Sequence, residues 1–315
     1  MFHVKQRRDG KMAKKAIEQK KKPRWRRWLA LILICALLIA LEWMHLTASV
    51  VHVRRATVRL RDLPQAFSGT TVLYCSDIDL CGIFDAPRMN RIFDQFKALN
   101  PDILLLGGDY VSPTLLERLN RKGAELSRAG DFLQSLGDFP APLGKFAISG
   151  ENDGGTDALR ATLEGTGVEV IDNSLAIVQK DGAAIGIVGV GGDSAALSAI
   201  AGNISADQCA IALAHSPDKI VDIRVCEAAG GGVWADLVLA GHTHGGQIRL
   251  FGRSVLSLNA QERQRLAGWY PDALPMLVTT GIGCEGANLR LGTQAEVWLI
   301  TLERADGTVQ MEFGG

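Results

Sequence analysis

Residues 237–247 read LVLAGHTHGGQ, and the prediction of the fold starts from this stretch. LVLA is a short apolar run that ends at a glycine, which is typical of a buried strand. His242 and His244 follow directly, and glycines at 241, 245 and 246 allow the backbone to pass close to a ligand. We therefore expect a strand end that presents two imidazoles to a site.

Four other apolar runs end in the same way. The residues that follow them are Asp77 and Asp79 after TVLYC (71–75), Asp109 after ILLL (103–106), Glu151 and Asn152 after KFAIS (145–149), and His215 after IALA (211–214). In open sheets, ligands gather at the carboxyl ends of the strands. The pattern predicts that five strand ends supply carboxylates and imidazoles to one rim.

The histidines favour this prediction. The chain has six, and His3, His45 and His52 belong to the amino-terminal region, whereas the other three all follow apolar runs. Alternate residues of an extended segment point the same way, so Asp77 can converge with Asp79, and His242 with His244.

Asp109 lies between these pairs in the pattern, where a carboxylate can bridge two cations. Two divalent cations about 3.5–4 Å apart activate water and neutralise a phosphoryl group during in-line displacement. The constellation therefore predicts a dinuclear metal centre.

The remaining patterns predict two packed sheets with helices outside, an α/β (α+β) fold. Helices are expected over 87–99, 115–136 and 156–163, and strands over 52–60, 71–75, 103–106, 145–149, 184–190, 211–214, 237–240, 277–280, 297–302 and 308–313. The last two strands are expected to form a hairpin about Asp306-Gly307.

The amino terminus predicts a membrane anchor. Residues 28–41 (WLALILICALLIAL) carry no charge, and the apolar character resumes after Glu42, so we expect a transmembrane helix over 28–50. Residues 1–27 hold twelve Lys and Arg against two acids, which predicts a cytoplasmic amino terminus and an extracytoplasmic domain over 51–315. A cleaved signal peptide, or a degenerate twin-arginine signal at Arg26-Arg27, stays open as an alternative.

The charge balance argues against nucleic acid as a partner. The net charge of the chain is zero, so the basic head leaves residues 28–315 with 22 basic and 32 acidic side chains. An acidic body repels nucleic acid phosphates.

Several motifs resemble the calcineurin-like metallophosphoesterase family: SDIDLCG, PDILLLGGDY, SGEND, AHSPD and GHTHGGQ. LPQAFSGTTVLYCSD and QAEVWLI are similar to its membrane-associated branch, which includes UDP-2,3-diacylglucosamine pyrophosphohydrolase-like enzymes. The resemblance implies a four-layer αββα sandwich. It also implies that Asp77, Asp79 and His244 bind a first metal, that Asp109 bridges, and that residue 151, His215 and His242 bind a second metal.

Two motifs depart from the family pattern. Asp77-Ile78-Asp79 stands where the family has D-x-H, and Gly150-Glu151-Asn152-Asp153 stands where it has G-N-H-[DE]. An ungapped match makes Glu151 the ligand and puts Asn152 in place of the histidine that assists the leaving group. A shift by one residue would make Asn152 the ligand. We expect Asp153 to be a solvated or turn residue.

We expect a metal-dependent phosphohydrolase that cleaves a phosphodiester or pyrophosphate bond, with Asp109 and Asn152 acting in catalysis. Four ligand carboxylates favour Mn²⁺, Mg²⁺ or Fe over Zn²⁺. The expected partner is a phosphate-containing small molecule or a lipid head group at the membrane. A catalytically silent metal-binding module on the same fold stays open, because of the departures at Asp79, Glu151 and Asn152.

Overall fold

A computed structural model of the chain describes residues 24–81, 84–254, 260–305, 307 and 309–314. Most of the expected basic segment 1–27, residue 306 of the expected last turn and residue 308 of the expected last strand lie outside this range. The chain forms two compact units, 1–43 and 44–315, each of which is described by itself.

The first unit holds most of one long helix, α1 (Arg24–Ser49). Its segment Trp25–Ser49 has a mean hydropathy of 2.3, so it is long and apolar enough to cross a membrane. The helix begins four residues before the expected start at residue 28 and ends one residue before the expected end at residue 50.

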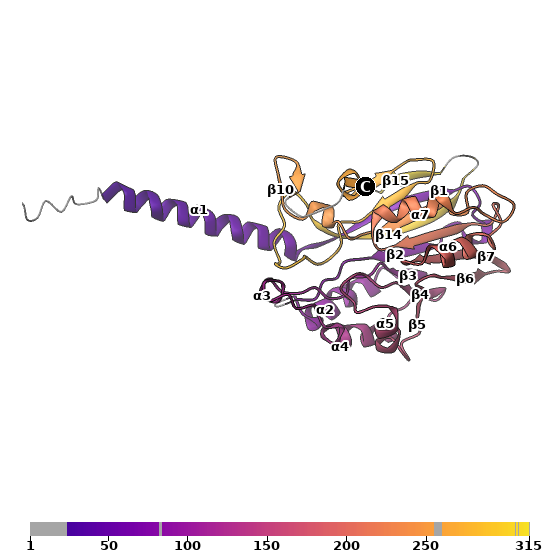
Figure 1. Ribbon diagram of the computed structural model, residues 1–315, viewed down its shortest axis with the longest axis horizontal. Helices are drawn as coiled ribbons and strands as arrows, with labels where there is room; N and C mark the ends of the chain where they lie inside the picture. Colours follow the sequence, from indigo (N-terminus) through magenta and orange to yellow (C-terminus); the bar gives the residue numbers. More distant parts are fainter. Residues whose placement is uncertain (1–23, 82–83, 255–259, 306, 308, 315) are drawn as a thin grey trace, which may run out of the picture. The chain divides into compact units, whose positions relative to one another are not determined.

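The second unit contains two large sheets (Figure 1). The first has the strand order β15 (Gln310–Phe313), β1 (Val51–Leu60), β14 (Ala295–Arg304), β2 (Thr71–Cys75), β3 (Ile103–Leu106), β4 (Gly144–Ala147) and β5 (Val168–Val170). The second has the order β12 (Gly268–Tyr270), β13 (Met276–Val278), β9 (Leu237–Ala240), β8 (Ala210–Ala214), β7 (Ala183–Val190) and β6 (Ser174–Lys180). A hairpin joins β10 (Arg249–Leu250) to β11 (Arg253–Ser254).

The helices are short and lie mostly on the outer faces of the sheets. They are α2 (Ala86–Lys97), α3 (Leu115–Leu119), α4 (Gly130–Ser135), α5 (Thr156–Thr162), α6 (Ser194–Ala201), α7 (Ile220–Val225) and α8 (Ala260–Gln264). Single 3₁₀ turns span Gln65–Phe67, Leu126–Ala129, Leu136–Asp138, Pro217–Lys219 and His244–Gly246.

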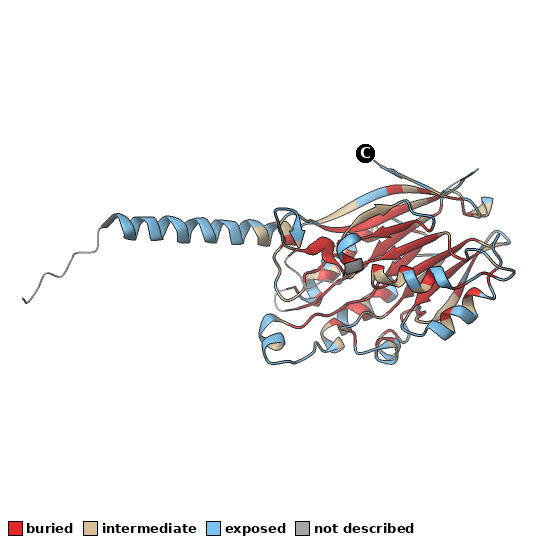
Figure 2. Ribbon diagram, turned by 45° about the horizontal axis from the view of Figure 1, so that its top comes forward, coloured by how far each residue is buried: buried red, intermediate tan, exposed pale blue. Residues whose placement is uncertain are grey.

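Alternation along the buried strands produces the layers. Ile103 and Leu105 point into a core shared with Ile211 and Leu239 of the other sheet, because successive strand residues face opposite sides. Leu104 packs instead on the outer face, in a cluster with residues of α2, α4 and α5. A third cluster joins β7, β8 and β9 to α6 and α7. Figure 2 shows the central strands of the sheets buried and the helices outside them more exposed. The expected αββα order is therefore confirmed.

The single helix expected over 115–136 is wrong. The chain forms α3, then a break, then a 3₁₀ turn and α4. The backbone turns left-handed at Arg121 (φ 55°), which ends α3. Glu117 caps the amino terminus of α3 and also forms an ion pair with Arg128 beyond the break. This ion pair connects α3 to the 3₁₀ turn that follows the break.

The expected carboxyl-terminal hairpin is also wrong. Residues Val51–Leu60 pair in parallel with β14 along all ten positions, from Val51 against Ala295 to Leu60 against Arg304. β1 therefore occupies the edge of β14 that a hairpin would need, and β15 pairs antiparallel with the far edge of β1. A local turn signal could not reveal a strand inserted from the other end of the chain.

Candidate metal centre

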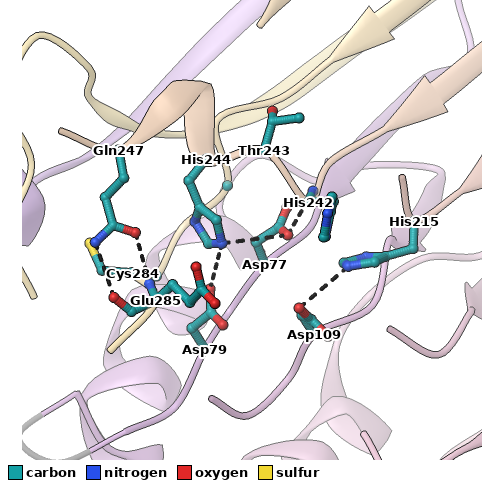
Figure 3. Close-up of polar contacts among 12 residues, drawn as sticks. Asp77, Asp79, Asp109, His215, His242, Thr243, His244, Gln247, Cys284 and Glu285 are labelled. Atoms are coloured by element: carbon teal, nitrogen blue, oxygen red, sulfur yellow. Dashed lines mark hydrogen bonds and ion pairs between the residues drawn. The ribbon is translucent and has the colours of Figure 1, made fainter. Parts of the chain in front are cut away.

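Five strand ends converge on one rim, as Figure 3 shows for most of the side chains involved. The segments that follow β2, β3 and β4 carry the acids of the site, and those that follow β8 and β9 carry the histidines. The side chains brought together are Asp77, Asp79, Asp109, Glu151, His215, His242 and His244. All three histidines of the expected site thus lie within contact distance of its carboxylates.

The backbone at these positions is not extended. Asp77, Asp79, Asp109, His242 and His244 have φ angles of 53°, 49°, 54°, 68° and 50°. We expected alternate residues to converge because their segments would be extended. That expectation is wrong, because the residues converge on a left-handed backbone. Left-handed non-glycine residues cost on the order of 1–3 kcal/mol each and persist only where the surroundings enforce them. Long-range bonds enforce them here, such as the backbone N–H of Asp79 to the carbonyl of Asp109 at 2.9 Å.

Close backbone approach explains two of the glycines. A Cβ at Gly150 would lie 2.2 Å from Oδ1 of Asp109, and one at Gly241 would lie 2.2 Å from Oδ2 of Asp77. Any side chain at either position would displace a carboxylate of the site.

One half of the rim gathers Asp109, Glu151, His215 and His242, whose candidate ligand atoms all lie within 4.8 Å of one another. Nε2 of His215 is 2.7 Å from Oε2 of Glu151 and 3.3 Å from Oδ2 of Asp109. Nδ1 of His242 is 2.9 Å from Oε1 of Glu151. Glu151 therefore faces both imidazoles.

The other half gathers Asp77, Asp79 and His244. Nε2 of His244 is 3.3 Å from Oδ2 of Asp79 and 3.9 Å from Oδ1 of Asp77. A bond from the backbone N–H of His242 to Oδ1 of Asp77, at 2.8 Å, joins the two halves.

The ring of His215 is held in one orientation. Its Nδ1 lies 2.8 Å from the carbonyl of Gly107, which can only accept, so Nδ1–H donates. Nε2 then faces the carboxylates of Asp109 and Glu151. Burial works to lower the pKa of the ring, but these carboxylates hold that pKa well above its usual value. A bound cation would take the place of the proton on Nε2. A histidine that binds metal through one nitrogen commonly donates its other N–H in this way.

The side chains fit a pair of cations. Six buried atoms of the site make no hydrogen bond within the described residues, namely Oδ2 of Asp77, both carboxylate oxygens of Asp79, Nε2 of His215, Nδ1 of His242 and Nδ1 of His244. Buried polar atoms are nearly always satisfied, so such a group points to an ion that is not part of the chain. Short N–O contacts without hydrogen-bond geometry are what ligands of a common ion show.

The electrostatics lead to the same conclusion. Burial raises the pKa of Asp77 to about 6, and burial together with the charge of Asp109 holds the pKa of Asp79 well above its usual value. Burial and the charge of Arg290 hold the pKa of His244 well below its usual value, so this ring is neutral. Cations would compensate the crowded carboxylates and bind the neutral imidazole.

Glu151 and Asn152 have different surroundings. Burial works to raise the pKa of Glu151, but its short contacts with His215 and His242 lower it, so Glu151 is a carboxylate. Asn152 turns to Asp109 instead: its backbone N–H donates to Oδ1 at 3.0 Å and its side-chain amide donates to Oδ2 at 2.9 Å. Asn152 thus positions Asp109, and Glu151 occupies the ligand-like place.

Asp153 has a structural role: of the two expected alternatives, solvated or turn residue, it is a turn residue and is not solvated. Its side chain is fully buried and accepts backbone N–H groups of Asp109, Tyr110 and Gly150 at 2.7–2.9 Å. It fastens the loop after β3 to the loop after β4. Only its place in the SGEND motif could have indicated this role.

Two further residues belong to the surroundings of the centre, and Glu262 was not expected from the sequence. Oε1 of Glu262, in α8, lies 3.4 Å from Nε2 of His242. Arg290 is fully buried and donates to the carbonyls of Thr280, Gly281 and Gly283. The segment 281–283 in turn packs on Asp77, because the N–H of Gly283 donates to its carbonyl at 2.7 Å.

Residues 70–246, more than half of the chain, match the Calcineurin-like phosphoesterase family. The chain belongs to this family. This phosphoesterase is thus a hydrolase of phosphoester bonds, in a family whose members depend on a dinuclear metal centre. Of the two functions that the sequence left open, the family match supports the hydrolase.

Relatives of the phosphoesterase include an uncharacterized metallophosphoesterase of Aquifex aeolicus (strain VF5), which is 27% identical over 276 aligned residues; the alignment covers 83% of this chain and 95% of the relative. The uncharacterized metallophosphoesterase YkoQ of Bacillus subtilis (strain 168) is 23% identical over 78% of this chain and 88% of its own. Among solved structures, a novel archaeal phosphodiesterase aligns with a TM-score of 0.33 and 16% identity, over 67% of this chain and 84% of its own.

Proposed function

We propose that the phosphoesterase holds two divalent cations at the seven-residue rim and cleaves a phosphodiester or pyrophosphate bond of a lipid-linked substrate at a membrane surface. One observation carries the assignment of the centre: carboxylates and imidazoles from five strand ends meet there, and several buried side-chain atoms among them make no hydrogen bond within the described residues. We assign Asp77, Asp79 and His244 to the first cation, and Glu151, His215 and His242 to the second, with Asp109 between them.

The choice of cation follows from charge. Four ligand carboxylates formally neutralise two divalent cations, and hard oxygen donors favour Mn²⁺, Mg²⁺ or Fe over Zn²⁺. When bound, the two cations would supply an activated water and neutralise the phosphoryl group. The chain itself orients the ligands, through Gly107 on His215 and Asn152 on Asp109.

The substrate class follows in part from residue 152. The amide of Asn152 is engaged with Asp109 and has no acidic proton of imidazole type to give to a leaving group. General acid help is typically worth about 10²–10⁴-fold, so its loss weighs most on poor leaving groups. We therefore propose that the bond cleaved has a good leaving group, as a nucleotide phosphate is, in keeping with the resemblance to pyrophosphohydrolases.

The membrane location rests on α1 and the basic residues before it. We propose a single-pass anchor, a cytoplasmic segment over 1–27 and an extracytoplasmic domain over 51–315. An impermeant maleimide added to intact cells should label Val225→Cys and should not label Ala13→Cys. Labelling of Ala13→Cys alone would reverse the proposed orientation.

Turnover tests the catalytic proposal. The full chain in detergent with Mn²⁺ should hydrolyse bis(p-nitrophenyl) phosphate, and Asp109→Ala should abolish this activity. Asp193→Asn is the matched control, because Asp193 only caps the exposed end of α6 and asparagine caps equally well. Equal inertness of all three proteins with every divalent cation would overturn the proposal.

A further inference from the structure

We propose that the globular unit docks on the bilayer through an apolar rim on the face that carries residues 44–49, made of Leu115, Leu116 and Leu119 of α3 and of Leu250 and Phe251 in the β10–β11 hairpin. This rim would set the metal centre beside the lipid head groups. The proposal rests on the membrane anchoring proposed above.

The apolar rim is exposed to an unusual degree. Leu116 and Leu119 are 70% and 72% exposed, and Phe251 is entirely exposed at the tip of its hairpin. Soluble surfaces carry such side chains singly, whereas a group of them marks an interaction site. Neighbouring Arg121, Lys122 and Arg253 are also exposed, and basic side chains of this kind suit anionic head groups.

The two parts of the rim belong to one face. Figures 1 and 2 both place α3 and β10 at the end of the globular unit that holds the last residues of α1. The loop 285–291 links them: Gly286 bridges to Thr114 at the start of α3, Glu285 pairs with Arg118, and Leu291 bridges to Ile248 beside β10.

The last residues of α1 meet this same loop. The hydroxyl of Ser49 accepts from the side-chain amide of Asn288 at 3.2 Å, and the carbonyl of Met44 accepts from the N–H of Arg290 at 3.1 Å. Val50 alone separates α1 from β1, and one residue spans only about 3.8 Å. A helix that ends in a bilayer therefore keeps this face at the lipid surface, which identifies the bilayer as the occupant.

The rim also lies beside the candidate metal centre. Gln247, three residues after His244, accepts from the N–H of Glu285 at 2.9 Å and lies shortly before β10 (Figure 3). Seating α3 and the hairpin on the membrane would bring the His244 side of the centre toward the head groups. A phosphate carried by a lipid could then reach the centre without leaving the bilayer.

Depth-dependent fluorescence quenching tests the docking without any need for turnover. The full chain with Cys35→Ser would carry one NBD-labelled cysteine, at Leu116→Cys, Phe251→Cys or, as the control, Val225→Cys, in vesicles with doxyl-labelled phosphatidylcholine. Val225 is 73% exposed and apolar, but lies in α7. We expect several-fold stronger quenching at 116 and 251 than at 225.

A second arm separates docking from incidental proximity. Leu116→Ser with Phe251→Ser should reduce the quenching of a label at Leu119→Cys several-fold, since the loss of apolar contacts frees the rim. Flotation with vesicles tests the anchor separately. A chain that floats while its rim labels are quenched no more than the label at 225 overturns the docking alone. Rim labels that respond only to protein concentration would indicate a second copy instead, and would overturn it too.

Discussion

The side-chain amide of Asn152 donates to Oδ2 of Asp109 at 2.9 Å while its backbone N–H donates to Oδ1 at 3.0 Å. Both oxygens of the carboxylate proposed to lie between the two cations are therefore bound by one residue. This clamp fixes the carboxylate plane at the point where the two halves of the centre meet.

Replacement of Asn152 should weaken the centre without dismantling it. Asn152→Ala keeps the hydrogen bond from the backbone N–H to Asp109 and loses the one from the side-chain amide. The carboxylate of Asp109 can then rotate more freely. Loss of a partner that orients a ligand typically costs about 10–100-fold in metal affinity or activity. We expect a reduction of that size in kcat, measured with bis(p-nitrophenyl) phosphate at saturating Mn²⁺. Asn203→Ala, at an exposed helix end, is the control, and equal kcat in both variants would contradict the clamp.

Asp79→Asn should change stability in opposite directions with and without metal. Asp79 is buried beside the charges of Asp109 and Asp77, so without cations the variant removes a repulsive buried carboxylate. We expect a higher unfolding midpoint than wild type in EDTA. A ligand present at 100 times its Kd adds about 2.7 kcal/mol to the free energy of unfolding. The gain in the free energy of unfolding on adding Mn²⁺ should be smaller in the variant than in wild type. The exposed Asp94→Asn should do neither, and a lower midpoint of Asp79→Asn in EDTA would refute the idea.

Asp153→Asn should destabilise the globular unit. The carboxylate accepts hydrogen bonds from three backbone N–H groups. An asparagine side chain has only one oxygen, so its NH₂ group would face one or more of these donors. Hydrogen bonds to charged groups are worth about 1.5–3 kcal/mol, so we expect a loss of about 2–3 kcal/mol in the free energy of unfolding. Urea titration monitored by tryptophan fluorescence measures this loss. Asp157→Asn, at an exposed position of α5, should leave the midpoint unchanged.

Asp236 should give the stability a pH dependence away from the metal centre. Burial raises its pKa to about 7, and the nearby charge of Asp62 adds to this. Because the folded pKa exceeds the unfolded value of 3.8, the folded state binds more protons between about pH 4 and 7. Stability is therefore lost as pH rises through this range.

Asp236→Asn should remove that loss, since an amide oxygen can still accept from the N–H of Ala210. The variant should equal wild type near pH 4 and exceed it at pH 8, by on the order of 1 kcal/mol for every pH unit that separates the folded and unfolded pKa values. Chemical denaturation at pH 4 and pH 8 measures this difference in the free energy of unfolding. Effects of metal binding that are common to both proteins cancel in the comparison. A variant advantage that is the same at pH 4 and pH 8 would contradict the raised pKa.

The sequence by itself determined which residues meet at the site. Asp77, Asp109, His215 and His242 each follow an apolar run, and parallel strands bring their carboxyl ends to one edge of a sheet. That relationship depends only on local hydrophobic pattern and on the direction of the strands. The layered architecture followed from the same pattern, because alternating buried residues need a helix or a second sheet on each face.

Tertiary structure alone decided how these residues are held. The left-handed backbone at Asp77 and Asp79 depends on bonds to the loop after β3, some thirty residues away. The buried role of Asp153 and the contact of Glu262 with His242 likewise require segments far apart in the chain to meet. β1 takes the place of the expected hairpin partner for the same reason. Local propensity cannot encode such pairings, since their free energy appears only once the sheets have assembled.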